Sequence, residues 1–170
     1  QLFKKAFYAH QQPVSIGTIK ASLEMYVRSL VNLNSKFDQN IRGVSSSMTA
    51  KEIQGANLFL GKAACATCHF PPNFNGFVPP HYNDTEGEIL GTTSHGTSSE
   101  LDDDMGVYER FKNSYPEATY IKGMFKTPTI RNVEFTAPYM HNGTFENLEV
   151  VVDFYNNGGG VGLGINIPQQ

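Results

Sequence analysis

Three segments of the chain carry apolar side chains at every third or fourth position, which is the spacing of one face of an α-helix. The longest covers residues 15–33, where charged side chains occupy the other side and the apolar positions are Ile16, Ile19, Leu23, Val27 and Leu30. Ser15 suits the N-cap, because its hydroxyl can accept a hydrogen bond from a free amide of the first turn. We therefore expect one long amphipathic helix here, followed by a connector over residues 32–43.

Two further helices are predicted along the chain. Thr49 and Glu52 have the spacing of a capping box, and Gly61 can end the helix that they begin. The stripe expected to be buried on this helix consists of Ile53, Ala56 and Leu60. The last helix is ended by Asn and Gly residues at 156–160, and its apolar face carries Leu148, Val151, Val152 and Tyr155.

The segment from residue 70 to about 108 is rich in Pro, Gly, Asn, Ser and Thr, and it predicts a long loop. Its acidic triplet, residues 102–104, is interpreted as a solvated loop, with calcium binding as the alternative. His81 and His95 are interpreted as surface residues. The fold class predicted from these elements is mainly α, with long loops.

Composition excludes some partners. The 170 residues carry a net charge of -3, so there is no polybasic signature of nucleic-acid or anionic-membrane binding. No apolar run is long enough to span a membrane. The chain begins at Gln1 without a signal peptide, so we expect it to be a fragment of a longer protein.

The only two cysteines, Cys65 and Cys68, precede His69 in a C-x-x-C-H motif, the attachment signature of c-type haem. Two thioethers would hold the ring, and His69 would ligate the iron as the proximal ligand. A zinc site lacks a second ligand pair, a thioredoxin-like motif lacks its βαβ setting, and cysteines three apart suit a disulfide poorly. A haem would also complete the core, because only 39% of the residues are hydrophobic.

The motif and three other segments resemble the second haem domain of bacterial di-haem cytochrome c peroxidases. These segments are Leu58–His69, Phe125–Val133, Thr136–Gly143 and the helix beginning Leu148-Glu149. Residues 2–7 and 34–38 resemble the connection between the two haem domains of that family. The resemblance therefore divides the chain into a connecting helical segment, 1–43, and a cytochrome c-like haem domain, 44–170, with the C-terminal end truncated.

The resemblance implies a periplasmic, exported oxidoreductase that reduces hydrogen peroxide with electrons from a small donor protein, a cytochrome c or a cupredoxin. This chain would hold one electron-transfer haem c, and a missing N-terminal domain would hold the second, peroxidatic haem. No catalytic residue is therefore expected on this fragment. In the family a calcium ion lies between the domains, and the matching backbone carbonyls are those of Thr136 and Pro138. A homodimer is a further possible assembly of the complete protein.

The distal iron ligand is open between Tyr155 and Met140, with His141 as a third candidate. In the family register the axial position matches Tyr155, and a tyrosine there is typical of the MauG-like branch, which oxidises protein side chains. Met140 is the alternative, because His/Met ligation is common in cytochromes c. By periodicity alone Tyr155 would be a core aromatic. His141 is interpreted as a hydrogen-bonding group near the haem, and Arg131 as a propionate partner or an ordinary ion-pair residue.

Two alternative functions remain. Tyr155 favours a MauG-like oxidase of protein side chains. A free-standing mono-haem electron carrier is the other, and it would be distinguished by a single haem on the complete protein.

Overall fold

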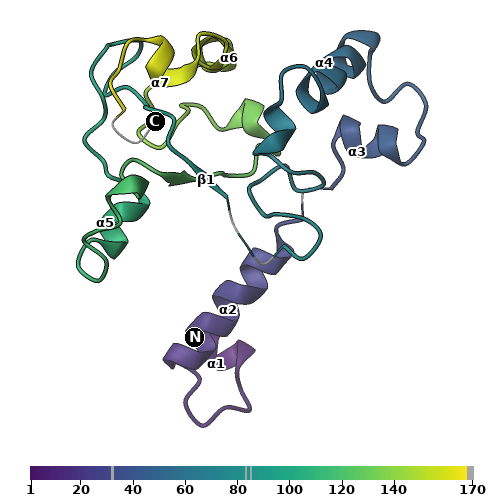
Figure 1. Cartoon of the computed structure of the whole chain (residues 1–170). Coiled ribbons are helices and arrows are strands. Elements are labelled where there is room, and N and C mark those ends of the chain that lie inside the picture. Colours follow the sequence, from purple (N-terminus) through teal and green to yellow (C-terminus); the bar gives the residue numbers. More distant parts are fainter. Residues whose placement is uncertain (32, 83, 85, 168–170) are drawn as a thin grey trace. The chain divides into compact units, whose positions relative to one another are not determined.

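The computed structural model describes residues 1–31, 33–82, 84 and 86–167, and the chain divides into two compact units, Gln1–Ser47 and Met48–Gln170 (Figure 1). The sequence-based boundary between residues 43 and 44 stays a prediction. Each unit is built mainly from helices, and strand pairing is limited to two short segments of the larger one.

The smaller unit contains the long predicted helix. This is α2, Ile16–Ser29, and Ser15 caps it in a reciprocal capping box with Thr18. A short helix, α1 (Leu2–Ala6), precedes it. The apolar stripe of this helix is exposed, since Leu23 and Val27 are 60% and 64% exposed. The buried side chain of α2 is instead the polar Thr18, whose hydroxyl donates to the carbonyl of Pro13 at 2.9 Å.

The expected connector over residues 32–43 is also wrong, because it contains a helix, α3 (Lys36–Ile41). Ser35 caps this helix, and the Asp38 carboxylate accepts hydrogen bonds from the Ser35 amide and hydroxyl at 2.9 and 2.7 Å. Acidic residues also suit the first turn of a helix, because they face its partial positive charge. Asn32 lies outside the described residues.

The larger unit begins with the second predicted helix, α4 (Ala50–Leu60). The predicted capping box is confirmed, with the Glu52 carboxylate 2.6 Å from the Thr49 amide, and Gly61 is the C-cap. The expected burial of its stripe is wrong, because Ile53 and Leu60 are 42% and 47% exposed. Shortly after α4, the 3-10 helix η1 (Cys65–Thr67) begins at the first motif cysteine, and the second, Cys68, is its C-cap.

The middle of this unit is irregular chain held by a small antiparallel pair, β1 (Gly87–Glu88) and β2 (Phe125–Lys126). The pairing continues beyond β1, since the Glu86 amide donates to the Gly76 carbonyl and the Thr127 amide donates to the Glu86 carbonyl. The remaining short elements of this part of the chain are α5 (Val107–Phe111), η2 (Thr119–Ile121) and η3 (Val133–Phe135).

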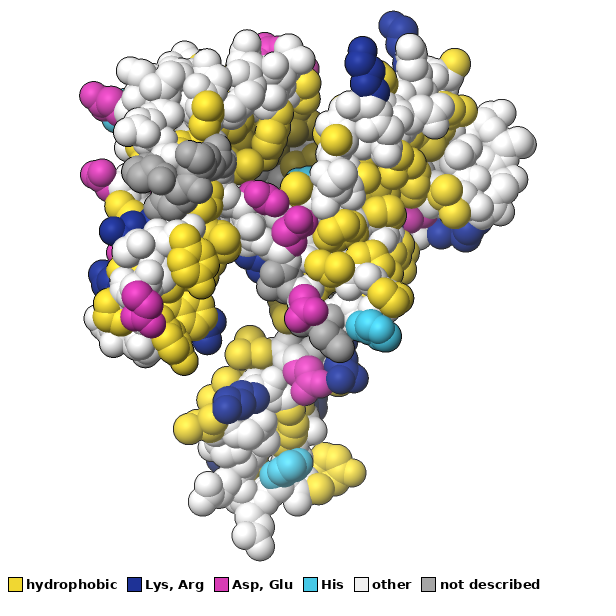
Figure 2. Space-filling model, viewed as in Figure 1, with side chains coloured by type: hydrophobic (Ala, Val, Ile, Leu, Met, Phe, Trp, Pro, Cys, Tyr) yellow, Lys and Arg dark blue, Asp and Glu magenta, His cyan; other side chains and the backbone are white. Residues whose placement is uncertain are grey.

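The third predicted helix is confirmed as α6, Leu148–Asn156, capped by Asn147 and followed by α7, Gly159–Gly162. The residue it buries is Phe154, which packs on the fully buried Phe145 with ring centroids 5.3 Å apart. The expected apolar face therefore differs, because Val152 and Tyr155 are 64% and 48% exposed. The core is small, and many apolar side chains lie on the surface (Figure 2).

Among the residues that the structure describes, no helix combines the length and the apolar character needed to cross a lipid bilayer.

A candidate cofactor-attachment site around Cys65, Cys68 and His69

The two cysteines are presented by a tight turn at the end of α4. Ala64 adopts a left-handed conformation with φ of 55°, and the next three residues form η1. The His69 amide donates to the Cys65 carbonyl at 3.0 Å, which fixes the motif backbone. Both thiols are free, with Cys65 exposed and Cys68 partly buried, so a disulfide between them is not formed. Two reactive groups are thus displayed next to one imidazole.

The imidazole of His69 is oriented by two backbone carbonyls. Its Nδ1 lies 3.1 Å from the oxygen of Pro128 and 3.3 Å from that of Phe74. Both partners can only accept, so Nδ1 carries the proton and the lone pair of the neutral ring is on Nε2. Burial lowers the pKa of His69, and the two carbonyl hydrogen bonds act in the opposite direction. A neutral ring with a free Nε2 is the form that ligates a metal.

The charges of the motif cysteines affect the pKa of Tyr155, which lies at the end of α6. Burial of its ring raises the pKa of Tyr155, and the negative charges of Cys68, Cys65 and Glu88 raise it further. Its ring contacts Phe154 edge-on at 5.6 Å, while 48% of the residue remains exposed. A tyrosine hydroxyl with a raised pKa stays protonated unless a cation binds it.

Met140 is placed differently. It is partly buried and has a positive φ of 69° in the turn that leads to Gly143. Among the described residues, no hydrogen bond, ring contact or electrostatic interaction joins its side chain to His69 or to the cysteines. The choice between Tyr155 and Met140 as a ligand stays a prediction.

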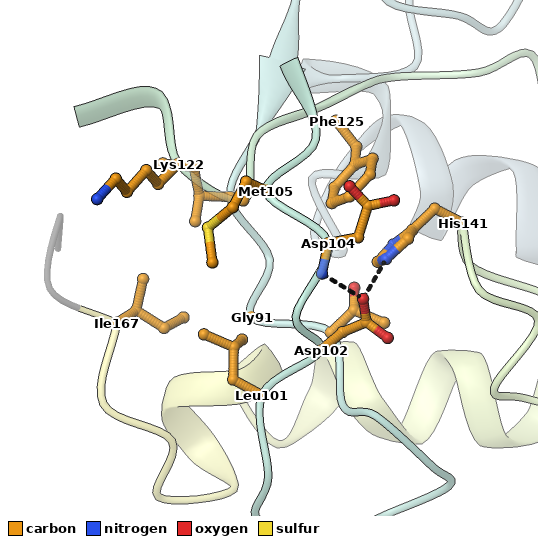
Figure 3. A pocket seen from close by; sticks show the side chains of 12 residues that line it. Gly91, Leu101, Asp102, Asp104, Met105, Lys122, Phe125, His141 and Ile167 are labelled. Carbon is orange, nitrogen blue, oxygen red and sulfur yellow. Dashed lines mark hydrogen bonds and ion pairs between the residues drawn. The ribbon is translucent and has the colours of Figure 1, made fainter. Parts of the chain in front are cut away.

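His141 belongs to a separate polar cluster (Figure 3). Its Nε2 lies 3.3 Å from Asp102 Oδ1, and its ring stacks on Phe125 with centroids 3.7 Å apart. The Asn142 amide donates to Asp102 Oδ2 at 2.8 Å and to the Thr93 carbonyl at 2.8 Å. These hydrogen bonds join the loop of Asn142 to the loop that contains Thr93 and Asp102. The acidic triplet thus serves as a loop anchor through Asp102.

A cavity of about 130 Å³ adjoins this cluster. Leu101 and Met105 of one loop and Ile167 of the C-terminal segment point into it, and His141 and Asp102 form one wall (Figure 3). Neither motif cysteine lines it, and its volume is below the roughly 300–1,000 Å³ of sites for large ligands. It is therefore distinct from the site at Cys65 and Cys68.

Arg131 is positioned beside the carbonyl partners of His69. Its Nε and one terminal nitrogen donate to the carbonyl of Pro72 at 3.0 and 2.5 Å, and its guanidinium lies 5.4 Å from the centre of the Phe74 ring. Arg131 therefore contributes to holding the loop whose carbonyl orients His69. An approach to a propionate stays a prediction.

Thr136 and Pro138, whose carbonyls were predicted to bind calcium, are both exposed. The chain turns before Gly143, whose amide donates to the Met140 carbonyl and whose φ is 70°. A Cβ at Gly143 would approach the Pro138 ring to 3.0 Å, so both the backbone conformation and the space favour glycine there. The calcium assignment itself stays a prediction.

The donor set fits a covalently attached haem better than a lone metal ion. Among the described residues, the group that could hold an ion is Cys68, Glu86 and Glu88, whose ligand atoms lie within 4.8 Å of one another, and His69 is not part of it. A zinc site of Cys and His ligands is therefore not formed. Two free thiols beside an imidazole with a free Nε2 supply the two thioethers and the axial nitrogen that haem c needs.

Three residues of this site were not found by sequence reasoning. Pro128 and Phe74 act through backbone carbonyls, which every residue possesses, so no residue type marks them. Glu88 contacts Cys68 at 3.6 Å. It lies on a strand of two residues, which is too short for an alternating hydrophobic pattern to predict a strand there.

No protein-family model matches the chain. It is similar to curated proteins, among them the cytochrome-c peroxidase IdrP1 of Denitromonas iodatirespirans, at 36% identity over 85% of this chain and 42% of the relative. Methylamine utilization protein MauG of Methylorubrum extorquens is 32% identical over 93% of this chain and 39% of the relative. The chain spans about two fifths of the length of these relatives.

A solved structure is also similar to this chain. The crystal structure of a MauG-like protein associated with microbial copper homeostasis matches 92% of this chain and 45% of its own, with a TM-score of 0.75 and 27% identity. This likeness confirms the predicted helix-rich fold.

Proposed function

Because this chain is a homologue of the bacterial cytochrome c peroxidases and of MauG, we propose that residues 44–170 form a domain that carries one haem c and transfers electrons. The observation that carries the proposal is the geometry of the motif. Cys65 and Cys68 present free thiols, and His69 presents Nε2 because Nδ1 is held by the carbonyls of Pro128 and Phe74.

The residues have separate roles in this proposal. The two cysteines fix the haem through thioethers, and the haem supplies one-electron chemistry when bound. Pro128 and Phe74 hold the His69 ring in one tautomer and one orientation. Tyr155 would be the second protein ligand of the haem iron, and Met140 is the alternative. Two protein ligands leave no position for peroxide, so this domain exchanges electrons and does not cleave the substrate.

In the complete protein the proposed reaction is the reduction of hydrogen peroxide to water. The peroxide-reacting haem would lie on an N-terminal domain, and a small cytochrome c or cupredoxin would donate electrons. The protein would act after export to the periplasm, and Thr136 and Pro138 would contribute carbonyls to a calcium ion between the domains. Support comes from relatives named as peroxidases, of which this chain matches about two fifths.

A second candidate is favoured by one residue. A tyrosine at the end of α6, whose pKa the charges of Cys68 and Cys65 raise after burial, supports a MauG-like oxidase that acts on protein side chains. MauG of Methylorubrum extorquens and the MauG-like crystal structure are among the similar proteins. Both candidates assign the same electron-transfer role to this domain.

Turnover measurements test whether this domain transfers electrons while the N-terminal domain reduces peroxide. The haem-loaded chain of 170 residues is expected to reduce or oxidise a small cytochrome in stopped-flow experiments while showing no steady-state consumption of peroxide. The same protein with its N-terminal domain is expected to consume peroxide with a reduced donor. Appreciable turnover by the 170-residue chain alone would contradict the proposal, because it would require an open or labile iron position.

A further inference from the structure

Two carboxylates face the haem-attachment cysteine from one side of β1. Glu86 and Glu88 are two positions apart in extended chain, so their side chains point to the same face. Glu88 Oε1 lies 3.6 Å from Cys68 Sγ, and one carboxylate oxygen of Glu86 lies within 4.8 Å of both. The face that carries both acids is therefore the face turned to the motif.

Backbone hydrogen bonds on both sides of this strand hold the backbone from which the two carboxylates extend. Glu88 pairs with Phe125 of β2 in the antiparallel register. The Glu86 amide donates to the Gly76 carbonyl at 2.7 Å, and the Glu86 carbonyl accepts from the Thr127 amide at 3.2 Å. The backbone of each acid is thus held beside the motif, and the two side chains extend from it toward Cys68.

The negative charge at this place is not neutralised by a neighbouring cation. Across residues 1–31, 33–82, 84 and 86–167, neither carboxylate forms an ion pair with a Lys, Arg or His side chain. The closest basic residue in sequence on the paired strand, Lys126, has its ammonium group 4.6 Å from the centre of the Phe77 ring. Both acids are partly buried, where a charge acts over a longer range than it does in water.

The acids also act on each other. Burial raises the pKa of Glu86, and the adjacent Glu88 raises it further. One oxygen of Glu86, Oε2, is buried without a hydrogen-bond partner among the described residues. Burying carboxylates together is unfavourable for folding, so this arrangement is unlike an ordinary solvated acidic surface.

We propose that Glu88, supported by Glu86, is a positioning residue that sets a low reduction potential for the haem c attached at Cys68. A fixed negative charge stabilises the more positive ferric form over the ferrous form. The inference rests on the proposed function, because it requires haem at Cys68. The charges of Glu86 and Glu88 would thus influence whether this haem accepts or gives up an electron.

Potentiometric titration of haem-loaded variants at one pH tests this inference. Glu88→Gln keeps the shape and removes the charge. At a fixed ambient potential it is expected to raise the ratio of reduced to oxidised haem by about tenfold, which is 59 mV for one electron. Glu86→Gln is expected to raise the ratio less, and Glu88→Asp, which keeps the charge, to stay near the wild type. Glu117→Gln, on an exposed loop, is the matched control and is expected to leave the ratio unchanged.

The outcomes separate this inference from the proposed function. A wild-type chain without covalent haem would overturn the proposed function. Haem-loaded Glu88→Gln and Glu86→Gln variants with the wild-type potential would overturn the electrostatic role alone. An equal shift in Glu117→Gln would also overturn it, because the effect would then follow net charge. Loss of haem from Glu88→Gln would overturn it as well, by assigning Glu88 to haem attachment.

Discussion

His69 Nδ1 lies 3.1 Å from the carbonyl oxygen of Pro128, although 59 positions separate the two residues in the sequence. The contact ties the motif at the end of α4 to the segment that follows β2. Proline has no amide hydrogen, so the backbone of Pro128 offers only its carbonyl oxygen for hydrogen bonding. The contact determines which ring nitrogen of His69 faces the cofactor, and the central claims about the site depend on it.

Replacing His69 with glycine should remove the proximal ligand while the thioethers keep the haem in place. We expect the variant to retain covalent haem and to lose the six-coordinate low-spin spectrum, because Nε2 no longer reaches the iron. Added imidazole should restore that spectrum. The control is His81→Gly, which alters an exposed loop residue. A low-spin spectrum in His69→Gly without imidazole would show that another residue is the proximal ligand.

Replacing Tyr155 with phenylalanine should open the distal iron position. A phenolate is a hard anionic ligand that favours ferric iron, so its loss should raise the potential and allow small ligands such as cyanide to bind. Absorption and electron paramagnetic resonance spectra measure both effects. Tyr120→Phe, at a residue that is 69% exposed, is the matched control.

The same spectra decide between the two distal candidates. Met140→Leu should leave the low-spin spectrum and the potential nearly unchanged, and the wild-type ferric protein should lack the near-infrared band of methionine-to-iron charge transfer. If Met140→Leu abolishes the low-spin spectrum while Tyr155→Phe has no effect, Met140 is the ligand and Tyr155 is a packing residue.

Replacing Phe145 with alanine should destabilise the larger unit strongly. Phe145 is 1% exposed and packs on Phe154, so the substitution leaves a cavity in a small core. The expected loss in free energy of unfolding is about 3–5 kcal/mol, measured by urea denaturation of the haem-loaded chain. Phe135→Ala removes a phenyl ring that is 78% exposed and should cost less than about 0.5 kcal/mol. Similar losses in both variants would contradict the assignment of the core.

Asp102 should make the larger unit sensitive to acid. Hydrogen bonds from Asn142 and from the Asp104 amide lower the pKa of Asp102 below its ordinary value of 3.8, and His141 lowers it further. A carboxyl with a lowered pKa contributes stability that is complete above 3.8 and is lost as the pH falls through the lower folded-state value. The urea midpoint of the wild type should therefore fall more steeply below about pH 4 than that of Asp102→Asn. Parallel curves for the two proteins would show that Asp102 is not the linked group.

Local signals made the helices predictable from the sequence. Ser15, Thr49 and Asn147 each cap a helix within three residues of the amide they bind, so the information is contained in a short window. The same signal was available for α3 at Ser35 and Asp38, and it was missed because the surrounding residues show no apolar period.

Packing could not be predicted from periodicity alone. The stripes of α2 and α4 have helical spacing, yet Leu23 and Leu60 are 60% and 47% exposed. Spacing shows which residues share a face, but what covers that face depends on contacts distant in sequence. The candidate site also combines a local signal with a distant contact. The C-x-x-C-H motif is recognisable from five consecutive residues. Its orienting carbonyl, at Pro128, depends on the tertiary fold.

The most direct test of the central claim is the mass of the denatured chain after expression with a periplasmic haem-attachment system. The account predicts a mass that exceeds the polypeptide by one haem, a pigment that resists acid-acetone extraction, and a proteolytic peptide in which Cys65 and Cys68 both carry the haem. A chain that has passed through the same system and has the mass of the bare polypeptide, with both thiols free to alkylation, would contradict it.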